Sequence, residues 1–329
     1  MNLQLMDVTL RESNYVPNTP LTLDYAKQVI EGLSRSNIDF IEIGYISSEA
    51  KKEYLPSYSP VKYIEALGES VVRGSNTKLV LMLHPHQYTD DLMERMTQKC
   101  VGLVRLCIPL ANVDFSLPLI KKLKANNIIV SANLIRASSA SSNEIVDFTE
   151  KVEEAGADYM YLADSNGAML PNQISELYSL LHNKFKIRLG FHPHNNLHVA
   201  SANALEAINA GASVIDGSLY GFGKGLANLS LESFVAVINR LDHKKRDLRN
   251  LIETSNKAYQ HFIKPGVENL FMVKQKGILT GYCNVNLDIV EKAEMISKQQ
   301  NIHSIDLLLK MFDSGQSSLN LNYLQEFVF

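Results

Sequence analysis

The stretch that organises the chain is KIRLGFHPHNN at residues 186–196, in which one residue separates two histidines, His192 and His194. The apolar run before them predicts a β-strand, and the periodic run 197–210 predicts a helix. Side chains alternate between the faces of a strand, so the two imidazoles point the same way and suit one metal ion. A strand followed by a helix places the pair at the functional end of a β/α unit.

The same alternation of short apolar runs and longer helical patterns recurs about eight times before the composition changes near residue 242. The predicted strands are 3–8, 40–44, 79–83, 103–108, 128–134, 159–163, 187–191 and 214–219, and helical spacing is clear at 23–33, 143–155 and 171–181. Eight such units over roughly 240 residues predict a (β/α)8 TIM barrel. A doubly wound open sheet is the alternative, but it carries its glycine-rich turn after the first strand, whereas here residues 221–225 follow the last.

Domain organisation follows from the same pattern. We expect a catalytic barrel over residues 1–242 and a C-terminal helical region over residues 243–329. Helical patterns at 248–262, 290–300 and 305–312 support the second unit. We find no internal repeat beyond the β/α alternation.

Composition excludes several classes of partner. The 329 residues carry a formal charge of -3 with both signs interspersed, so neither nucleic acid nor a membrane surface is indicated. Cys100, Cys107 and Cys283 are too widely spaced for a disulfide framework or a zinc knuckle. The chain starts without a recognisable export signal, and we expect a cytoplasmic protein.

Polar side chains gather where the predicted strands end. The strand ends carry, in chain order, Arg11 with Glu12, Glu42, His84, Arg105, Asn133, Asp164 and the two histidines. In a barrel these ends converge on one mouth, and a buried end has no reason to collect polar groups unless something polar binds there. The sequence therefore predicts one site built from several strands.

Two imidazoles and one carboxylate form a facial set of ligands that leaves positions open for a bidentate substrate. Glu12 is the best third ligand, and Arg11 beside it offers a planar fork for a carboxylate or an enolate oxygen. A salt bridge at the strand end is the structural alternative for both. His84 and His86 form a competing pair that we rank lower, because no acidic residue adjoins them and Pro85 interrupts regular strand pairing.

Three motifs in this order resemble the metallolyase barrel family that includes hydroxymethylglutaryl-CoA lyase, isopropylmalate and homocitrate synthases, and 4-hydroxy-2-oxovalerate aldolase. They are DVTLRE at 7–12, HPHN at 192–195 and the glycine-rich stretch 221–228. The aldolase branch is the most similar, through VR at 104–105, YLADSNG at 161–167, DGSL at 216–219 and the C-terminal segments at 281–293 and 305–308. The resemblance covers nearly the whole chain.

The resemblance implies roles for matching residues. Glu12, His192 and His194 would bind the metal, and Asn228 matches an asparagine that approaches it. Arg11 would steady the enolate. The substrate-binding residues implied are Arg11, Arg105, Ser165 and His192.

The chain also departs from the family pattern. Ser13 replaces a common glycine, and Tyr15 stands where the aldolases have a catalytic histidine. Tyr15 is therefore our first candidate to move the proton of the 4-hydroxyl group, with Arg11 or the metal needed to lower its pKa. A late tyrosine of the aldolases corresponds to Tyr282 or is replaced by Asn286.

These observations predict a lyase, namely a divalent-metal-dependent aldolase that cleaves or forms a 4-hydroxy-2-oxo acid through a pyruvate enolate. Mn or Mg is favoured by resemblance, while Co and Zn also suit the ligands. The alternatives are a synthase that condenses an acyl-CoA with a 2-oxo acid, and a non-catalytic barrel that acts as a binding subunit. The resemblance also suggests two protein partners, a second copy of the chain in a homodimer and an aldehyde dehydrogenase. The expected small-molecule partner is the 2-oxo acid substrate.

Overall fold

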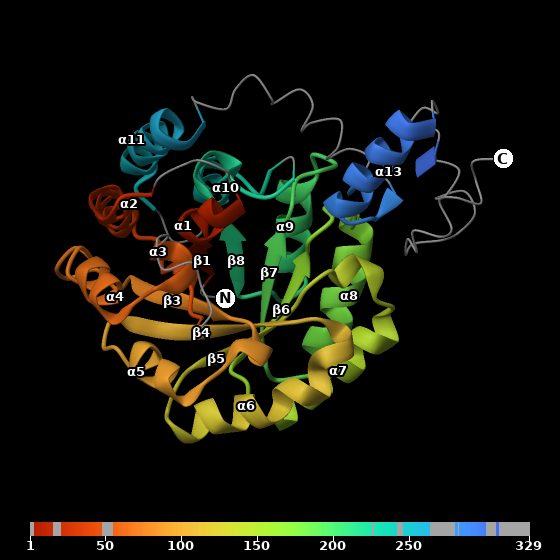
Figure 1. Cartoon of the computed structure of the whole chain (residues 1–329), viewed down its shortest axis with the longest axis horizontal. Helices are drawn as coiled ribbons and strands as arrows, with labels where there is room; N and C mark the ends of the chain where they lie inside the picture. Colours follow the sequence, from red (N-terminus) through yellow and green to blue (C-terminus); the bar gives the residue numbers. More distant parts are fainter. Residues whose placement is uncertain are drawn as a thin grey trace.

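Eight parallel strands close into a barrel in the computed structural model, which describes residues 3–15, 21–47, 55–225, 227–241, 246–263, 280–281, 283–300 and 307–308. The strands are β1 (Gln4–Asp7), β2 (Phe40–Tyr45), β3 (Lys78–Leu83), β4 (Val101–Ile108), β5 (Val130–Leu134), β6 (Tyr159–Asp164), β7 (Arg188–Pro193) and β8 (Val214–Gly217). Each strand pairs with the next, and β8 pairs with β1 (Figure 1). The TIM barrel prediction is confirmed, and each predicted strand is present with its ends shifted by two residues or fewer.

Helices surround this barrel and connect its strands (Figure 1). They are α1 (Thr9–Glu12), α2 (Leu23–Arg35), α3 (Leu55–Tyr58), α4 (Val61–Gly68), α5 (Met93–Met96), α6 (Val113–Ala125), α7 (Ser142–Glu154), α8 (Pro171–Lys184), α9 (Ala200–Asn209), α10 (Leu231–Arg240), α11 (Leu248–Ala258) and α13 (Leu287–Gln300). Short turns η1 (Ser13–Tyr15), η2 (Pro85–Gln87), η5 (Ala137–Ser139) and η7 (Tyr259–Ile263) lie between or beside them. The predicted helices at 23–33, 143–155, 171–181 and 197–210 correspond to α2, α7, α8 and α9.

Local sequence explains these helices. The side chain of Thr22 caps α2 by accepting a hydrogen bond from the Tyr25 amide, and Ser141 with Glu144 forms a capping box on α7. The apolar residues of α2 recur at helical spacing and are buried against the barrel: Ala26, Val29, Ile30 and Leu33. Caps thus mark where these helices begin, and the apolar stripe fixes which face turns inward.

The interior of the barrel changes character along its axis. An apolar cluster inside it contains Met6, Val8, Phe40, Val80, Leu103, Tyr159, Tyr161 and Val214. Two residues further along three of these strands the inward positions hold Glu42, Arg105 and Asp216, all fully buried. The carboxyl ends of the strands therefore rest on a charged layer, which in turn rests on an apolar one.

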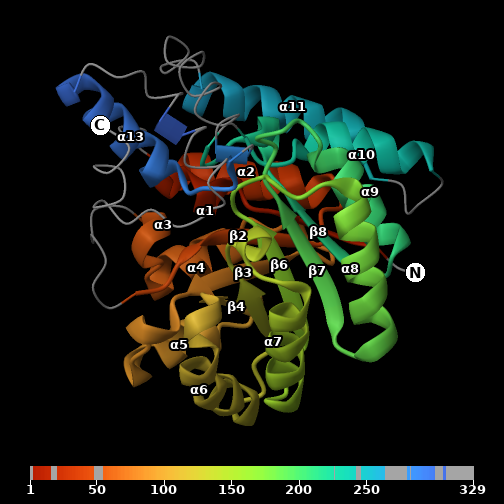
Figure 2. The same cartoon turned by 90° about the vertical axis from the view of Figure 1, so that its right-hand side faces the viewer.

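The C-terminal region contacts the barrel at several places. Asn250 of α11 donates from Nδ2 to Gly32 O and Ser36 Oγ on α2 and its C-cap, both at 3.0 Å. Near α13, Asn284 Oδ1 accepts from Ser138 Oγ at 2.8 Å and from Asn166 Nδ2 at 2.9 Å. Figure 2 shows α13 at the same end of the barrel as α1 and α3.

The division at residue 242 stays a prediction, because residues 242–245 and most of the predicted helix at 305–312 lie outside the described residues. Within the described part of the chain, no helix is long and apolar enough to cross a membrane.

Gly190 provides a test of the barrel interior. A Cβ atom at this position would lie 2.4 Å from the Tyr161 ring, which is fully buried and lies 4.4 Å beneath the guanidinium of Arg105. We expect Gly190→Ala to lower the free energy of unfolding by about 1–3 kcal/mol through overpacking, measured by urea denaturation. Asn172→Ala, on the exposed surface of α8, should change it by less than about 0.5 kcal/mol. Equal effects of the two changes would contradict this reading of the core.

Candidate active site

A cavity of about 220 Å³ opens at the carboxyl ends of the strands, where a TIM barrel places its active site. Seven of the eight residues predicted for the site from the sequence, all except Asn228, line it. The lining residues are Arg11, Glu12, Tyr15, Tyr45, Met82, His84, Arg105, Cys107, Asn133, Ile135, Arg136, Ala163, Ser165, His192, His194, Lys224 and Asn286. The predicted convergence of several strand ends on one site is therefore present in the structure.

His192 and His194 stand side by side, with ring centroids 5.2 Å apart. His192 Nδ1 lies 3.0 Å from Asp216 Oδ2, and His194 Nδ1 lies 3.1 Å from the carbonyl oxygen of Lys224. Because both partners are acceptors, each Nδ1 carries the proton and each Nε2 keeps its lone pair. Burial lowers the pKa of both imidazoles to about 3, so both are neutral at physiological pH.

Glu12 is held at the end of α1 from two directions. Its Oε1 accepts a hydrogen bond from Arg11 Nη1, and its Oε2 accepts one from the Lys224 backbone amide at 3.0 Å. Burial is the largest single influence and acts to raise the pKa of Glu12, but the charge of Arg11, the two neighbouring imidazoles and the Lys224 amide together outweigh burial, so the pKa is lowered. Gly223 permits this approach, because a Cβ atom there would lie 2.7 Å from Glu12 Oε2. The glycine-rich loop thus binds a side-chain carboxylate of the same chain, that of Glu12.

Asn228 lies close to Glu12, because a Cβ atom at Gly223 would contact both side chains. It pairs with His194 in an isolated antiparallel bridge, and its Nδ2 donates to the Phe222 carbonyl at 3.1 Å. Its Oδ1 is buried and has no hydrogen-bond partner among the described residues. A buried oxygen without a partner is costly, and a cation is one ligand that would satisfy it.

The donor set therefore fits a divalent cation in chemical type. Two neutral imidazoles with fixed Nδ1 protons, an ionised carboxylate and an unpartnered amide oxygen are ligands that Mn²⁺, Mg²⁺, Co²⁺ or Zn²⁺ accept. As they stand, no three His, Cys, Asp or Glu side chains of the described residues form a metal-binding group. The carboxylate of Glu12 instead accepts hydrogen bonds from Arg11 and from the Lys224 amide.

A chain of buried ion pairs links Arg11 to His192. Glu42 accepts from Arg11 Nε at 2.7 Å through one oxygen and from Arg105 Nη1 at 3.1 Å through the other. Arg105 Nη2 in turn donates to Asp216 Oδ2 at 2.7 Å, and that same oxygen contacts His192. Positive and negative side chains therefore alternate along this chain, which ends at the imidazole of His192.

Arg105 is fully engaged by the protein. Besides Glu42 and Asp216, its Nη1 contacts Met6 Sδ at 3.0 Å, and its guanidinium lies over the Tyr161 ring. With the amide of Asn133 oriented to satisfy both partners, its oxygen accepts from Nε at 2.8 Å and from Nη2 at 2.7 Å. Substrate binding by Arg105 stays a prediction, and its geometry is that of a support beneath the cavity floor.

Tyr15 and Ser165 both line the cavity. The Tyr15 hydroxyl lies 2.8 Å from the Tyr45 hydroxyl, and burial raises the pKa of Tyr15 instead of lowering it. Ser165 Oγ accepts from the Arg136 amide at 3.0 Å, which holds the hydroxyl at the cavity edge. The lowered pKa that we required for Tyr15 as a base is therefore not found, because desolvation exceeds the effect of Arg11.

Sequence reasoning assigned no role to two residues that organise the site, Glu42 and Asp216. Both stood in quoted strand-end motifs, and the signal that could have identified them was a carboxylate at an inward position of a buried strand. The tail also contributes Asn286, whose Oδ1 accepts from Lys224 Nζ at 3.1 Å. Tyr282, the other candidate for the late tyrosine, lies outside the described residues.

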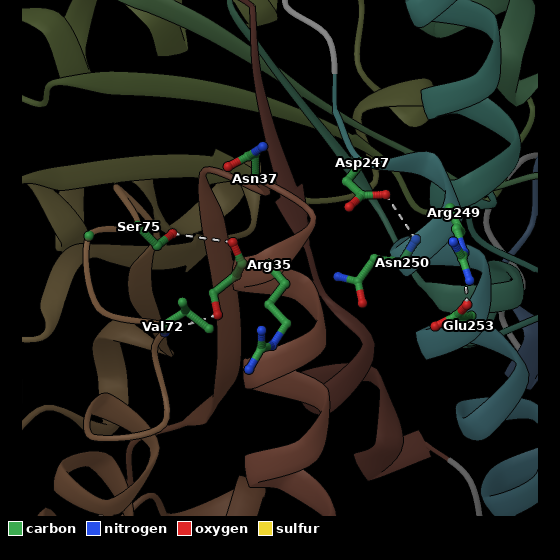
Figure 3. A pocket seen from close by; sticks show the side chains of 10 residues that line it. Arg35, Asn37, Val72, Ser75, Asp247, Arg249, Asn250 and Glu253 are labelled. Carbon is green, nitrogen blue, oxygen red and sulfur yellow. Dashed lines mark hydrogen bonds and ion pairs between the residues drawn. The ribbon is translucent and has the colours of Figure 1, made fainter.

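A second pocket of about 520 Å³ lies at the opposite end of the barrel (Figure 3). Loops that precede β2 and β3 line it together with α11, and its side chains bond to one another, as Arg249 does to Glu253 at 3.2 Å and Asp247 Oδ1 to the Asn250 amide at 3.0 Å. No residue that we predicted for the site lies there. The cavity at the carboxyl ends therefore remains the candidate site.

Comparison with known proteins shows which proteins this chain is similar to. The HMGL-like family matches residues 112–257. The 4-hydroxy-2-oxovalerate aldolases of Geobacillus thermodenitrificans and Stutzerimonas stutzeri are each 27% identical, over 93% and 95% of this chain and 89% and 90% of the respective relatives. The solved structure of the HMG-CoA lyase of Bacillus subtilis superposes with a TM-score of 0.68 at 18% identity, covering 83% of this chain and 98% of that one. The resemblance drawn from the sequence motifs is confirmed.

The ion-pair chain predicts a large effect for one small substitution. Glu42→Gln leaves two buried guanidiniums without their shared carboxylate, so we expect the free energy of unfolding to fall by about 3–5 kcal/mol in urea denaturation. Glu31→Gln is the matched control, because it removes an exposed partner of Arg35 and should cost less than about 1 kcal/mol. Similar losses in both variants would mean that Glu42 does not hold the network together.

Proposed function

We propose that this chain is a divalent-metal-dependent aldolase, a lyase that cleaves or forms a 4-hydroxy-2-oxo acid through the enolate of pyruvate. Similarity to the 4-hydroxy-2-oxovalerate aldolases over more than nine-tenths of the chain supports the reaction class. The observation that carries the proposal is the meeting of two neutral imidazoles, an ionised carboxylate and a guanidinium in one cavity.

His192, His194 and Glu12 would hold the metal, with Asn228 Oδ1 beside them. A divalent cation there would act as a Lewis acid toward the oxygens of the 2-oxo acid. We favour Mn or Mg through the family resemblance, and Co and Zn suit the same donors. The Asp216 carboxylate and the Lys224 carbonyl keep both imidazoles in the tautomer that leaves Nε2 available.

Arg11 is the residue that we assign to the developing negative charge of the enolate. Its Nε donates to Glu42 and its Nη1 to Glu12, so the guanidinium is held in place on the cavity wall before the substrate binds. A preorganised cation of this kind stabilises a developing oxyanion by about 3–4 kcal/mol. Ser165 would donate a hydrogen bond to the substrate. Arg105 would position Arg11 through Glu42 and His192 through Asp216.

Tyr15 keeps its proton, because burial raises its pKa above the ordinary value of about 10. It can therefore donate a hydrogen bond to the 4-hydroxyl group or the carbonyl that replaces it. A group other than Tyr15 therefore has to accept the proton of the 4-hydroxyl group. A homodimer and an aldehyde dehydrogenase partner remain predictions.

The test is deuterium exchange into pyruvate, followed by proton NMR with metal-stripped protein and after addition of Mn²⁺ or Mg²⁺. Exchange should require the metal. It should fall by about 100-fold or more in Arg11→Ala and His192→Ala, because each removes stabilisation of the enolate. Arg35→Ala, which changes an exposed arginine on α2, should exchange at the wild-type rate.

Folding of each variant is checked by circular dichroism, since Arg11→Ala removes one of the two donors to Glu42 and one of the two donors to Glu12. Arg11→Lys keeps the charge and serves as the second variant. Wild-type protein that binds Mn²⁺ but exchanges no 2-oxo acid would contradict the aldolase. Release of free CoA from acetyl-CoA with a 2-oxo acid would then favour the synthase, and failure to bind any divalent ion would favour the non-catalytic barrel.

A further inference from the structure

His84 is a histidine of the cavity that the proposed function does not use. It follows β3 directly, lines the cavity and is half-buried. Its ring stacks on Tyr45 with centroids 5.3 Å apart and planes 5° from parallel. In the described part of the chain the ring nitrogens of His84 make no hydrogen bond, in contrast to Nδ1 of His192 and His194.

Aldol cleavage needs a group that accepts a proton, and most cavity residues are unable to do so. The hydroxyls of Tyr15 and Tyr45 stay protonated, because burial raises the pKa of each. Burial likewise raises the pKa of the Cys107 thiol to about 11. Guanidiniums keep their protons at any physiological pH.

The remaining groups are occupied. Glu12 accepts from Arg11 and from the Lys224 amide, and the ammonium of Lys224 donates to Asn286. His192 and His194 belong to the proposed metal site. Among the described residues that line the cavity, His84 is the titratable side chain left with an open lone pair.

We propose that His84 is the catalytic base that takes the proton of the 4-hydroxyl group. This inference rests on the proposed function. The hydroxyl proton moves to the imidazole, the electron pair released from the O–H bond forms the second C4–O bond of the aldehyde, and the electrons of the breaking C3–C4 bond pass into the pyruvate enolate. Protonation of the enolate at C3 completes the reaction and regenerates neutral His84, and condensation follows the reverse course.

The surroundings of His84 keep its ring neutral. Burial lowers its pKa below the usual value of 6.5, and the nearby charges of His86 and Arg11 lower it further. The other titratable neighbours, Tyr45, Tyr15 and Cys107, are uncharged at neutral pH and do not oppose this. Because the neutral form is the base, activity should rise with pH through the pKa of His84 and level off near neutrality.

His84 and His86 formed a competing metal pair in the sequence, and in the structure the two side chains differ in exposure. Their ring centroids lie 5.6 Å apart with the planes tilted by 38°, and the side chain of His86 is exposed and does not line the cavity. His86 therefore provides a matched control two residues away.

The experiment measures cleavage of 4-hydroxy-2-oxovalerate by the full chain with saturating Mn²⁺, detecting pyruvate with lactate dehydrogenase. His84→Asn should lower kcat by about 100-fold or more and lose the acid limb of the kcat/KM profile. His86→Asn should stay within about twofold of wild type and keep that limb. His84→Ala should be slow and regain rate as imidazole is added, which a purely structural role would not produce.

Wild-type cleavage rates in His84→Asn would overturn the proposal. So would a slow His84→Ala variant that imidazole does not rescue, or a variant that keeps the acid limb. Loss of cleavage in Tyr15→Phe with His84→Asn unaffected would move the role to Tyr15. If the wild type shows neither cleavage nor metal-dependent exchange into pyruvate, the aldolase assignment fails instead, which separates the two failures.

Discussion

The structure depends on one buried carboxylate, Glu42, held between two guanidiniums. Arg11 and Arg105 approach its two oxygens at 2.7 and 3.1 Å inside a barrel that excludes water. Burying three charged groups costs several kcal/mol each unless they pair with good geometry. Removing any one of the three side chains would leave a buried charge without one of its partners, which is energetically costly. The pairing with Glu42 therefore fixes the position of Arg11 on the cavity wall.

The same constraint reaches the histidines through Arg105. Its second carboxylate partner, Asp216, accepts from His192 Nδ1 with the oxygen that also accepts from Arg105. The ion pairs thus set the tautomer of an imidazole as well as the place of a guanidinium. Below them the Tyr161 ring supports Arg105, and Gly190 leaves room for that ring. A glycine in β7 therefore influences the site without contacting it.

The loop after β8 completes the site from above. Its Lys224 backbone amide binds the carboxylate of Glu12. Its Lys224 carbonyl orients His194, and its Asn228 adds an unpartnered oxygen. Residue Asn286 of the C-terminal region reaches the cavity from the far end of the sequence. The residues that line the cavity and orient its side chains thus come from segments more than 200 residues apart in the sequence.

Sequence by itself determined the barrel, the strand ends and the facing pair His192 and His194, because periodicities of 2 and 3.6 residues are local properties of the chain. It also placed Arg11 and Glu12 in the site, since the carboxyl ends of parallel strands must meet at one mouth. Tertiary structure alone decided which acidic groups hold the arginines, that Tyr15 keeps its proton and that His84 faces the cavity while His86 faces solvent. These outcomes depend on burial and on partners distant in the chain, and desolvation and charge pairing are set by what folding brings together.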